Sequence, residues 1–410
     1  MIELVSENLD FLKVQVSKKG YDPAGLDELF ALAAQVKAKR RDLDDLRSSR
    51  KKGQRDAAIS RDAKRELGDR VRQEEAALKE LENRMTDLWL LVPNLPDADA
   101  PDGKDAASNV VVSESDTYKR PGVGSPLPHW EIGKSLGILD LESASKMSGK
   151  MFSLFLGKGS RLLRSLISYG LSLHCDKYQE ITPPHLVSTN TLTYTGHLPK
   201  FAEDQYSTSR DDLWLIPTAE VPLTAFSADQ VFDFDDLPRR SCAYTVCFRR
   251  EAGSYGTDTR GLQRVHEFHK VELLKIVEPS RCKEELADLL EDCLRIIKDL
   301  KLQYRVVDLC TGDMGDKYAR CFDIEVFAPG LQKWLEVSSV GHFSDYQARR
   351  ANIRYRASDG SKHFVYTMNG SGIATPRVWA AIIETYQQAD GTVEVPDVLV
   401  PFMGCSVIGK

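Results

Sequence analysis

The sequence has no long apolar run and no C-x-x-C pair of cysteines. Within its 410 residues, no apolar run approaches the roughly 20 residues that a membrane-spanning helix needs. The first residues carry acidic side chains early and show no basic and then apolar leader. None of the eight cysteines forms a C-x-x-C pair, so we expect reduced thiols, with neither disulfides nor a structural zinc. These absences predict a cytoplasmic protein without a membrane partner.

A strong excess of basic charge is also missing. The chain carries 55 Lys and Arg against 61 Asp and Glu, which gives a net charge of −6. This balance excludes a wholly basic protein that coats DNA, so we expect no DNA partner, but a local basic patch stays open. With 42% hydrophobic residues, the chain is long enough for a large core divided between two domains.

Residues 26–92 show the seven-residue periodicity of helices that pack side by side. The apolar residues that recur at sevens are Leu29, Val36 and Leu43, and then Val71, Leu78, Met85 and Val92. This spacing is typical of a coiled coil. Because a polar stretch with a glycine separates the two halves, we predict an antiparallel two-helix hairpin that turns near Gly53.

The far end of this hairpin is basic. From Lys37 to Arg72 there are fourteen Lys and Arg against seven Asp and Glu, a net charge of +7. A solvated helical face is the ordinary explanation of such charge. Here the excess gathers toward the tip, where a phosphate backbone could bind. Since no aromatic residue lies among these positions, base stacking is not expected.

A linker with proline and glycine, residues 93–104, separates the hairpin from a region of mixed strands and helices. Short β-rich runs such as 271–276 alternate there with helical patterns such as 282–300. Helices that are separate from the strands predict an α+β domain, built on an antiparallel sheet flanked by helices. We therefore expect an N-terminal domain over 1–100 and a second domain over 101–410.

The most informative stretch runs from Cys247 to Glu272. Arg249, Arg250 and Glu251 end an apolar strand, a glycine-rich loop follows, and a second strand alternates charged and aromatic residues. An arginine at a strand end offers a fixed fork for a phosphate or a carboxylate. Charged side chains that project from adjoining strands would cost too much free energy in a purely structural hairpin, where they would be unpaired. The stretch therefore predicts a nucleotide site.

This stretch resembles motif 2 of class II aminoacyl-tRNA synthetases, in the form found in the seryl-tRNA synthetase family. The resemblance continues along nearly the whole chain. The other similar segments are Tyr178–Pro184 (motif 1), Ile216–Thr224 (the TAE loop), Glu336–Ser339 with Asp345–Arg350, and Met368–Ala374 with Arg377 (motif 3). The hairpin lies where this family carries its tRNA-binding arm. The resemblance implies a class II catalytic domain that follows this arm.

For the nucleotide, the resemblance implies that Arg249 holds the α-phosphate, that Glu251 contacts the adenine edge and that Phe268 stacks on the ring. The implied ATP ligands are Arg249, Arg250, Glu251, Arg264, Val265, Phe268, Glu336, Val337, Ser338, Ser339 and Arg377. The implied catalytic residues are Arg249, Glu251 and Arg377. The implied Mg²⁺ ligands are Glu336 and Ser339, and the cation would neutralise charge on pyrophosphate.

For the amino acid, the resemblance implies that Thr218 and Glu220 bind the amino group of serine. Glu272 and Ser371 would surround its hydroxyl. The implied serine ligands are Thr218, Ala219, Glu220, Arg249, Glu272 and Ser371. A site built to hydrogen-bond a hydroxyl can reject the analogue that lacks it by about 10⁴-fold, so alanine should be excluded.

The implied function is activation of L-serine with ATP to seryl-adenylate, followed by transfer of serine to the 3′ end of tRNA(Ser), with tRNA(Sec) as a further acceptor. The implied cofactors are ATP and Mg²⁺, and motif 1 implies a homodimer. The implied tRNA contacts on the arm are Arg50, Lys51, Lys52 and Arg55. One alternative is a serine-activating paralogue that loads another acceptor or tolerates an inhibitor, and another is a non-catalytic tRNA-binding paralogue. The basic arm argues against the first, and the retained phosphate ligands argue against the second.

Several positions depart from the family pattern. They are Thr257, Glu267, Gly341 to Phe343, Thr375 with Pro376, and Met151. We expect Thr257, in the motif 2 loop, and the last group, Thr375 with Pro376 and Met151, to flank the ATP site or the path of the acceptor stem. The residues expected to touch ATP and serine are all present. Lineage drift and specialisation for a changed ligand are the two explanations.

Replacing both Lys51 and Lys52 with alanine should raise the KM for tRNA and flatten its salt dependence. With fewer phosphate contacts, tRNA binding releases fewer counterions, and this release is the source of the salt dependence. Amino-acid activation should stay unchanged. The measurement is charging of tRNA over a salt series. A double variant that charges like the wild type at 150 mM salt, where the screening length is about 8 Å, would exclude the contact at the tip.

Overall fold

The computed structural model describes residues 9–55, 60–252 and 260–410, and Thr257 lies outside these ranges. The chain divides into two compact units, Met1–Leu95 and Pro96–Lys410. In the described part, no helix is both long and apolar enough to cross a membrane.

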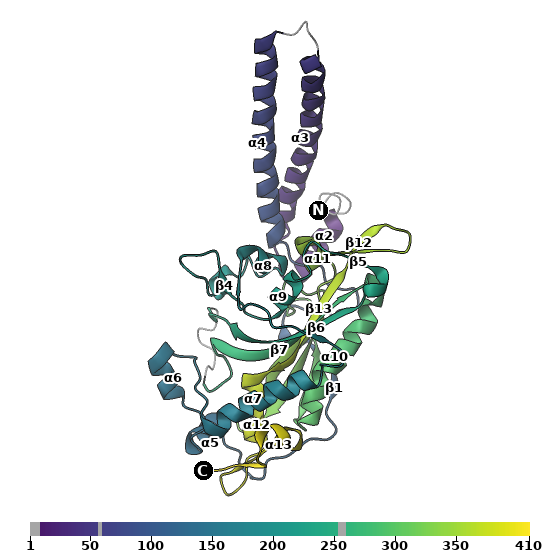
Figure 1. Cartoon of the computed structure of the whole chain (residues 1–410). Coiled ribbons are helices and arrows are strands. Elements are labelled where there is room, and N and C mark those ends of the chain that lie inside the picture. The colour runs from purple at the N-terminus through teal and green to yellow at the C-terminus, as the bar shows by residue number, and fades with distance from the viewer. Residues whose placement is uncertain (1–8, 56–59, 253–259) are drawn as a thin grey trace. The chain divides into compact units, whose positions relative to one another are not determined.

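The first unit is helical, with α2 (Leu9–Lys18), α3 (Ala24–Arg55) and α4 (Arg61–Leu91) (Figure 1). Ion pairs between α3 and α4 show their relative direction. Arg40 pairs with Glu82 at 2.6 Å, and Arg47, further along α3, pairs with Glu75, earlier on α4, at 2.8 Å. Because the partner number falls as the position along α3 rises, the two helices are antiparallel. The predicted antiparallel hairpin is confirmed.

The apolar seam between α3 and α4 follows the seven-residue pattern. Leu29, Val36 and Val71 are fully buried, as expected for coiled-coil core positions. Two positions of a second, parallel set of sevens carry charge: Lys39, seven residues after Leu32, and Glu74, seven residues after Leu67. These two residues form an ion pair with each other, so the two charges compensate across the seam.

The first helix ends later than the sequence predicted. The turn was expected near Gly53, but α3 continues through Gly53 to Arg55. One glycine inside a helix costs only about 1 kcal/mol relative to alanine, and good helix formers surround it. The start of α4 carries a clearer signal, since the Ser60 side chain accepts a hydrogen bond from the backbone N–H of Ala63 at 3.2 Å.

The second unit is built on an eight-stranded sheet with the order β1-β8-β9-β10-β13-β7-β6-β2. Neighbouring strands are antiparallel, except that β2 runs parallel to β6. The strands are β1 (Val110–Glu114), β2 (Gln179–Glu180), β6 (Arg239–Phe248), β7 (Glu267–Val277), β8 (Tyr304–Asp308), β9 (Arg320–Ala328), β10 (Lys333–His342) and β13 (Tyr366–Ala374). The predicted antiparallel sheet of an α+β domain is confirmed.

Short strands and helices complete this unit. The other strands are β3 (Leu186–Val187), β4 (Trp214–Leu215), β5 (Val231–Asp233), β11 (Arg354–Arg356), β12 (Lys362–Phe364), β14 (Val393–Glu394) and β15 (Val407–Ile408). The α-helices are α5 (His129–Ser135), α6 (Leu141–Ser148), α7 (Gly157–Ser172), α8 (Thr189–Tyr194), α9 (Glu220–Ala225), α10 (Cys282–Asp299), α11 (Tyr346–Ala351), α12 (Thr375–Thr385) and α13 (Val400–Met403).

Helices cover the two faces of the sheet unequally. On one face, α7, α10 and α12 pack on the largest core, which includes Val271 and Leu273 of β7 (Figure 1). On the other face, α9 and α11 cover a smaller core that includes Leu274 and Ile276 of the same strand. Successive residues of a strand point to opposite faces, and part of the second face stays free for a site.

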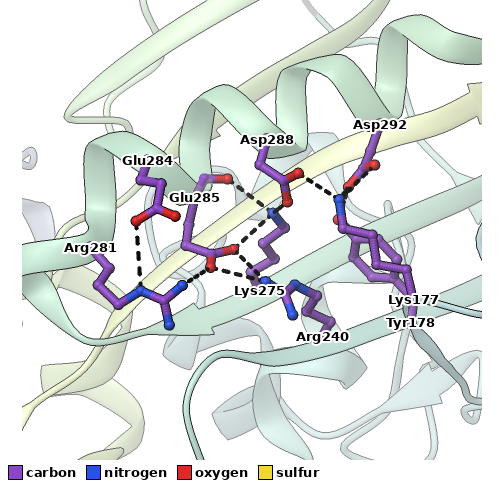
Figure 2. Close-up of polar contacts among 9 residues, drawn as sticks. All are labelled: Lys177, Tyr178, Arg240, Lys275, Arg281, Glu284, Glu285, Asp288 and Asp292. Carbon is purple, nitrogen blue, oxygen red and sulfur yellow. Dashed lines mark hydrogen bonds and ion pairs between the residues drawn. The ribbon is translucent and has the colours of Figure 1, made fainter.

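A buried charge network joins β7 to α10 (Figure 2). Lys275 is fully buried, and its ammonium bonds to Glu285 at 3.0 Å and to Asp288 at 2.5 Å. Asp288 also pairs with Lys177 at 2.7 Å. Tyr178, next to Lys177, donates its hydroxyl to Asp292 of α10 at 2.6 Å. The network ties the segment before the edge strand β2 to the centre of the sheet.

Replacing Lys275 with methionine should lower the free energy of unfolding by about 3 kcal/mol at pH 7, because removing one partner leaves a buried charge undercompensated. Burial would raise the pKa of Glu285, but the hydrogen bond and charge of Lys275 outweigh it, so the pKa lies below the ordinary 4.5. The stability that this pair supplies is therefore present at neutral pH and lost in acid.

The measurement is urea denaturation of both proteins over a pH series. The two stabilities should converge as the pH falls below 4.5, where the carboxyl becomes protonated. Lys283→Met is the matched control, because Lys283 is exposed and pairs with exposed Asp99, and it should behave like the wild type. A Lys275 variant as stable as the wild type at pH 7 would rule out a stabilising network.

Candidate active site

A cavity of about 450 Å³ lies on the face of β7 opposite the buried network. Phe268, Lys270 and Glu272, at alternate positions of β7, line it. The other walls come from the middle of β10, from β13, from the first turns of α9 and α12 and from loops, including the residues just after β6. Because successive side chains of a strand point to opposite faces, these residues line the cavity on one face of β7 while Lys275 joins the network on the other.

Most of the ligands predicted from the sequence line this one cavity. They are Thr218, Glu220, Arg249, Glu251, Arg264, Val265, Phe268, Glu272, Glu336, Val337, Ser338, Ser339, Ser371 and Arg377. Two predicted ligands do not line it. The exposed Arg250 donates to the backbone carbonyl of Glu203 at 3.0 Å, and Ala219 is fully buried in the smaller core.

One end of the cavity combines cations with an aromatic ring. The guanidinium of Arg249 lies 5.1 Å from the centre of the Phe268 ring, within the range of a cation–π contact. Arg264 donates to the carboxylate of Glu251 at 2.9 Å. Such a flat face beside two guanidinium groups suits a base and its phosphates.

Arg377 is aimed into the same end by backbone carbonyls. Its guanidinium donates to the carbonyl of Gln263 at 2.9 Å and to that of Glu336 at 2.7 Å. Arg377 lies in the first turn of α12, where the helix dipole also favours an anion. Pro376 fits this place, because the first turn of a helix does not use the N–H that proline lacks.

The predicted Mg²⁺ ligands lie together, beside the carboxyl group of Asp323. Ser339 donates its hydroxyl to Glu336 at 3.2 Å, and Asp323 faces Ser339 across the β9–β10 pair. Burial, and then the nearby charge of Glu336, raise the pKa of Asp323 well above its ordinary value. Carboxylate and hydroxyl oxygens are ligands that Mg²⁺ accepts together with substrate phosphates. The residues present therefore fit this cation.

The other end of the cavity contains buried carboxylates that are neutralised by lysines. Glu272 is fully buried and forms an ion pair with Lys270. The hydroxyl of Thr218 donates to Glu272 at 2.7 Å and accepts from Lys270 at 2.9 Å and from the backbone N–H of Glu220 at 3.1 Å. A hydroxyl has one donor and two acceptor positions, so that of Thr218 is fully used.

Glu220, the second buried carboxylate, is held by three other side chains. Lys317 reaches its two oxygens at 2.6 and 2.7 Å. Gln347 donates to one oxygen at 2.7 Å, and Asn369 donates to the other at 3.1 Å. Asn369 also donates to Glu272 at 3.1 Å, so its amide bridges the two carboxylates.

Lys270, Lys317 and Asn369 are polar residues of this end that were not among the predicted ligands. Lys270 lies in the alternating strand and Asn369 lies in the segment similar to motif 3, so both carried a signal in the sequence. Lys317 comes from the loop between β8 and β9, and nothing in its local sequence marks it.

Several positions that depart from the family pattern gather behind Phe268. Glu267, Thr375 and Pro376 line a second cavity of about 150 Å³ that shares the Phe268 side chain. Met151 has a positive φ of 65°, and its carbonyl accepts from the backbone N–H of His266 at 2.9 Å. These departures therefore adjoin the nucleotide end of the first cavity.

Comparisons with known proteins agree with this geometry. Residues 202–386 match the tRNA synthetase class II core domain (G, H, P, S and T), and residues 2–96 match the seryl-tRNA synthetase N-terminal domain. The chain is similar to the serine–tRNA ligase of Pseudothermotoga lettingae, with 41% identity over 100% of this chain and 99% of the relative. It is 43% identical to the serine–tRNA ligase of Thermotoga maritima, over 99% of both chains.

Two solved structures are similar along the whole chain. A seryl-tRNA synthetase from Pyrococcus horikoshii, complexed with ATP, has a TM-score of 0.91 and 31% identity, and covers 100% of this chain and 99% of its own. A cytoplasmic serine–tRNA ligase from Naegleria fowleri, in complex with AMP, has a TM-score of 0.88 and 26% identity, and covers 100% and 98%.

Proposed function

The chain belongs to the seryl-tRNA synthetase family of class II aminoacyl-tRNA synthetases, and we propose that its 450 Å³ cavity is where serine and ATP react. The protein is a class II serine–tRNA ligase, which charges tRNA with serine. The observation that carries the site proposal is the division of one cavity into a cationic, aromatic end and an end of buried carboxylates.

In the proposed reaction, the carboxylate of serine attacks the α-phosphorus of ATP. A bond forms between a carboxylate oxygen and phosphorus, the bond to the bridging oxygen breaks, and pyrophosphate leaves. Negative charge shifts onto phosphate oxygens, so fixed cations do most of the work. In this proposal Arg249, which lies on the Phe268 ring, binds the α-phosphate, and Arg377 and Arg264 bind the outer phosphates.

Glu336 and Ser339 would hold Mg²⁺, with Asp323 beside them. When bound, this cation supplies charge neutralisation on the departing pyrophosphate. Within the protein, Arg377 donates to the backbone carbonyl of Glu336. The guanidinium of Arg377 and the residues that would hold Mg²⁺ are therefore fixed relative to one another.

The acceptor step uses the first unit of the chain. Arg50, Lys51 and Lys52 lie in the last turns of α3, and the side chain of Arg55 is outside the described part. We propose that these residues contact the sugar–phosphate backbone of tRNA(Ser). Because a carrier protein or small-molecule acceptor does not need such an arm, an alternative acceptor is not favoured.

We also propose that two copies of the chain assemble through strand β2. The edge strand β2, within the segment similar to motif 1, offers one side of its backbone to a second copy of the chain. The buried network around Lys275 fixes the residues just before this strand. We place the enzyme, as a homodimer, in the cytoplasm.

Exchange of labelled pyrophosphate into ATP should depend on serine. Exchange with alanine should be weaker by about 10⁴-fold, because alanine lacks the hydroxyl that this polar end is proposed to hydrogen-bond. Threonine should also be rejected, since its extra methyl has to enter a polar, filled wall. Equal exchange with alanine or threonine would contradict the assignment of this end.

Replacing Arg249 with alanine should nearly abolish exchange, with a loss of about 10³-fold in kcat, because removing one fixed donor to a developing charge costs this much. Arg250→Ala is the matched control, since Arg250 is exposed outside the cavity, and it should retain exchange. If both variants kept wild-type exchange, the phosphate end would be misassigned.

A further inference from the structure

The carboxylate end contains one buried acceptor that the protein itself does not use. Asn369 is 3% exposed, and among the described residues no donor reaches its side-chain oxygen. Its nitrogen must be the atom that faces Glu220 and Glu272, because only an N–H can donate to carboxylates. An unpaired buried acceptor is costly, and Asn369 lines the cavity. Its oxygen is therefore left for a donor of the bound amino acid.

This orientation of the amide depends on how the Glu220 carboxylate is held. A carboxylate accepts at about four positions, and those of Glu220 take two bonds from Lys317, one from Gln347 and one from Asn369. The two bonds from Lys317 reach both oxygens and keep the carboxylate facing the amide. Without Lys317, two of these acceptor positions would be empty, and the carboxylate could turn away from Asn369. The amide nitrogen would then lose one of its two acceptors, and the amide could rotate its oxygen away from the bound amino acid.

Lys317 lies against two aromatic rings, and one of them, Phe343, departs from the family pattern. Its ammonium lies 5.3 Å from the centre of the Phe343 ring and 5.7 Å from that of Tyr318. These two rings are stacked, with centres 4.9 Å apart. A Cβ at Gly341 would come within 2.5 Å of the Tyr318 ring, so only glycine leaves room for that ring. Gly341 also pairs directly with Asn369 across β10 and β13.

We propose that Lys317 is a positioning residue of the serine site. By holding the Glu220 carboxylate in place, it fixes the Asn369 amide with its oxygen toward the amino acid, and Gly341 and Phe343 support the position of Lys317. This inference deepens the proposed function and rests on it.

The test is serine-dependent pyrophosphate exchange by the full-length Lys317→Met variant. The KM for serine should rise about tenfold, the KM for ATP should stay within twofold, and kcat should change by less than threefold. Lys317→Arg keeps the charge and the donors and should restore the KM for serine to within threefold of the wild type. Lys283→Met, at an exposed ion pair, is the matched control and should leave all three constants unchanged. A serine KM within twofold of the wild type in Lys317→Met would overturn the proposal.

A double-mutant cycle with Asn369→Ala tests whether Lys317 acts through this amide. Once Asn369 is absent, Lys317→Met should raise the serine KM by less than threefold further. If the two effects multiply, Lys317 acts by another route and the proposal is wrong.

A folding defect is handled by a second variant. Should Lys317→Met lose its thermal unfolding transition, the Lys317→Met and Glu220→Leu double variant replaces the buried pair with apolar groups, which proteins often tolerate. It should fold and show the same tenfold rise in serine KM, and a wild-type KM would overturn the proposal. Absence of serine-dependent exchange in the wild type would instead contradict the proposed function itself.

Discussion

Buried charge on strand β7 is the constraint on which the rest of the catalytic unit depends. A charge removed from water must be paired with groups from elsewhere in the chain, and β7 buries charge on both faces. On the helix face, Lys275 requires Glu285 and Asp288 of α10. On the cavity face, Lys270 and Glu272 require each other and further polar partners. Helix, sheet and cavity walls are thereby held at fixed positions about one strand, which is what a reaction that relies on positioning needs.

The two ends of the cavity carry side chains of different chemistry. Guanidinium groups and the Phe268 ring form the nucleotide end, where charge develops during activation. Carboxylates and lysines form the amino-acid end, where each acceptor is either already used or, like the oxygen of Asn369, left for a ligand. The departures from the family pattern lie around this division. Glu267 and Pro376 lie behind Phe268, whereas Gly341 and Phe343 lie behind Lys317. These four residues lie next to the ligand groups and are not themselves among them.

In the arm, the sequence pattern predicted the helices and the seam well, because a seven-residue apolar repeat has few other solutions. Gly53 misled the placement of the turn, since one glycine does not end a helix of good helix formers. The net charge of the basic segment also left out the glutamates that pair with it from outside that segment. Residues 37–72 carry +7, and subtracting this from −6 leaves −13 for the rest of the chain. Lys39, Arg40 and Arg47 pair with glutamates beyond that range, so the excess is concentrated toward the tip.

The sequence by itself determined the two-helix arm, the antiparallel sheet and the segments that supply the cavity, because periodicity and local motifs act over neighbouring residues. It also led to most of the residues that line the cavity. Only the tertiary structure decided which buried groups pair. Lys317 lies 97 residues from Glu220, and no local pattern links a loop lysine to a carboxylate at the start of α9. The tertiary structure likewise showed that Glu220 is already saturated and that Asn369 is not. A residue type fixes the number of donors and acceptors, but only the fold decides which of them remain for a substrate.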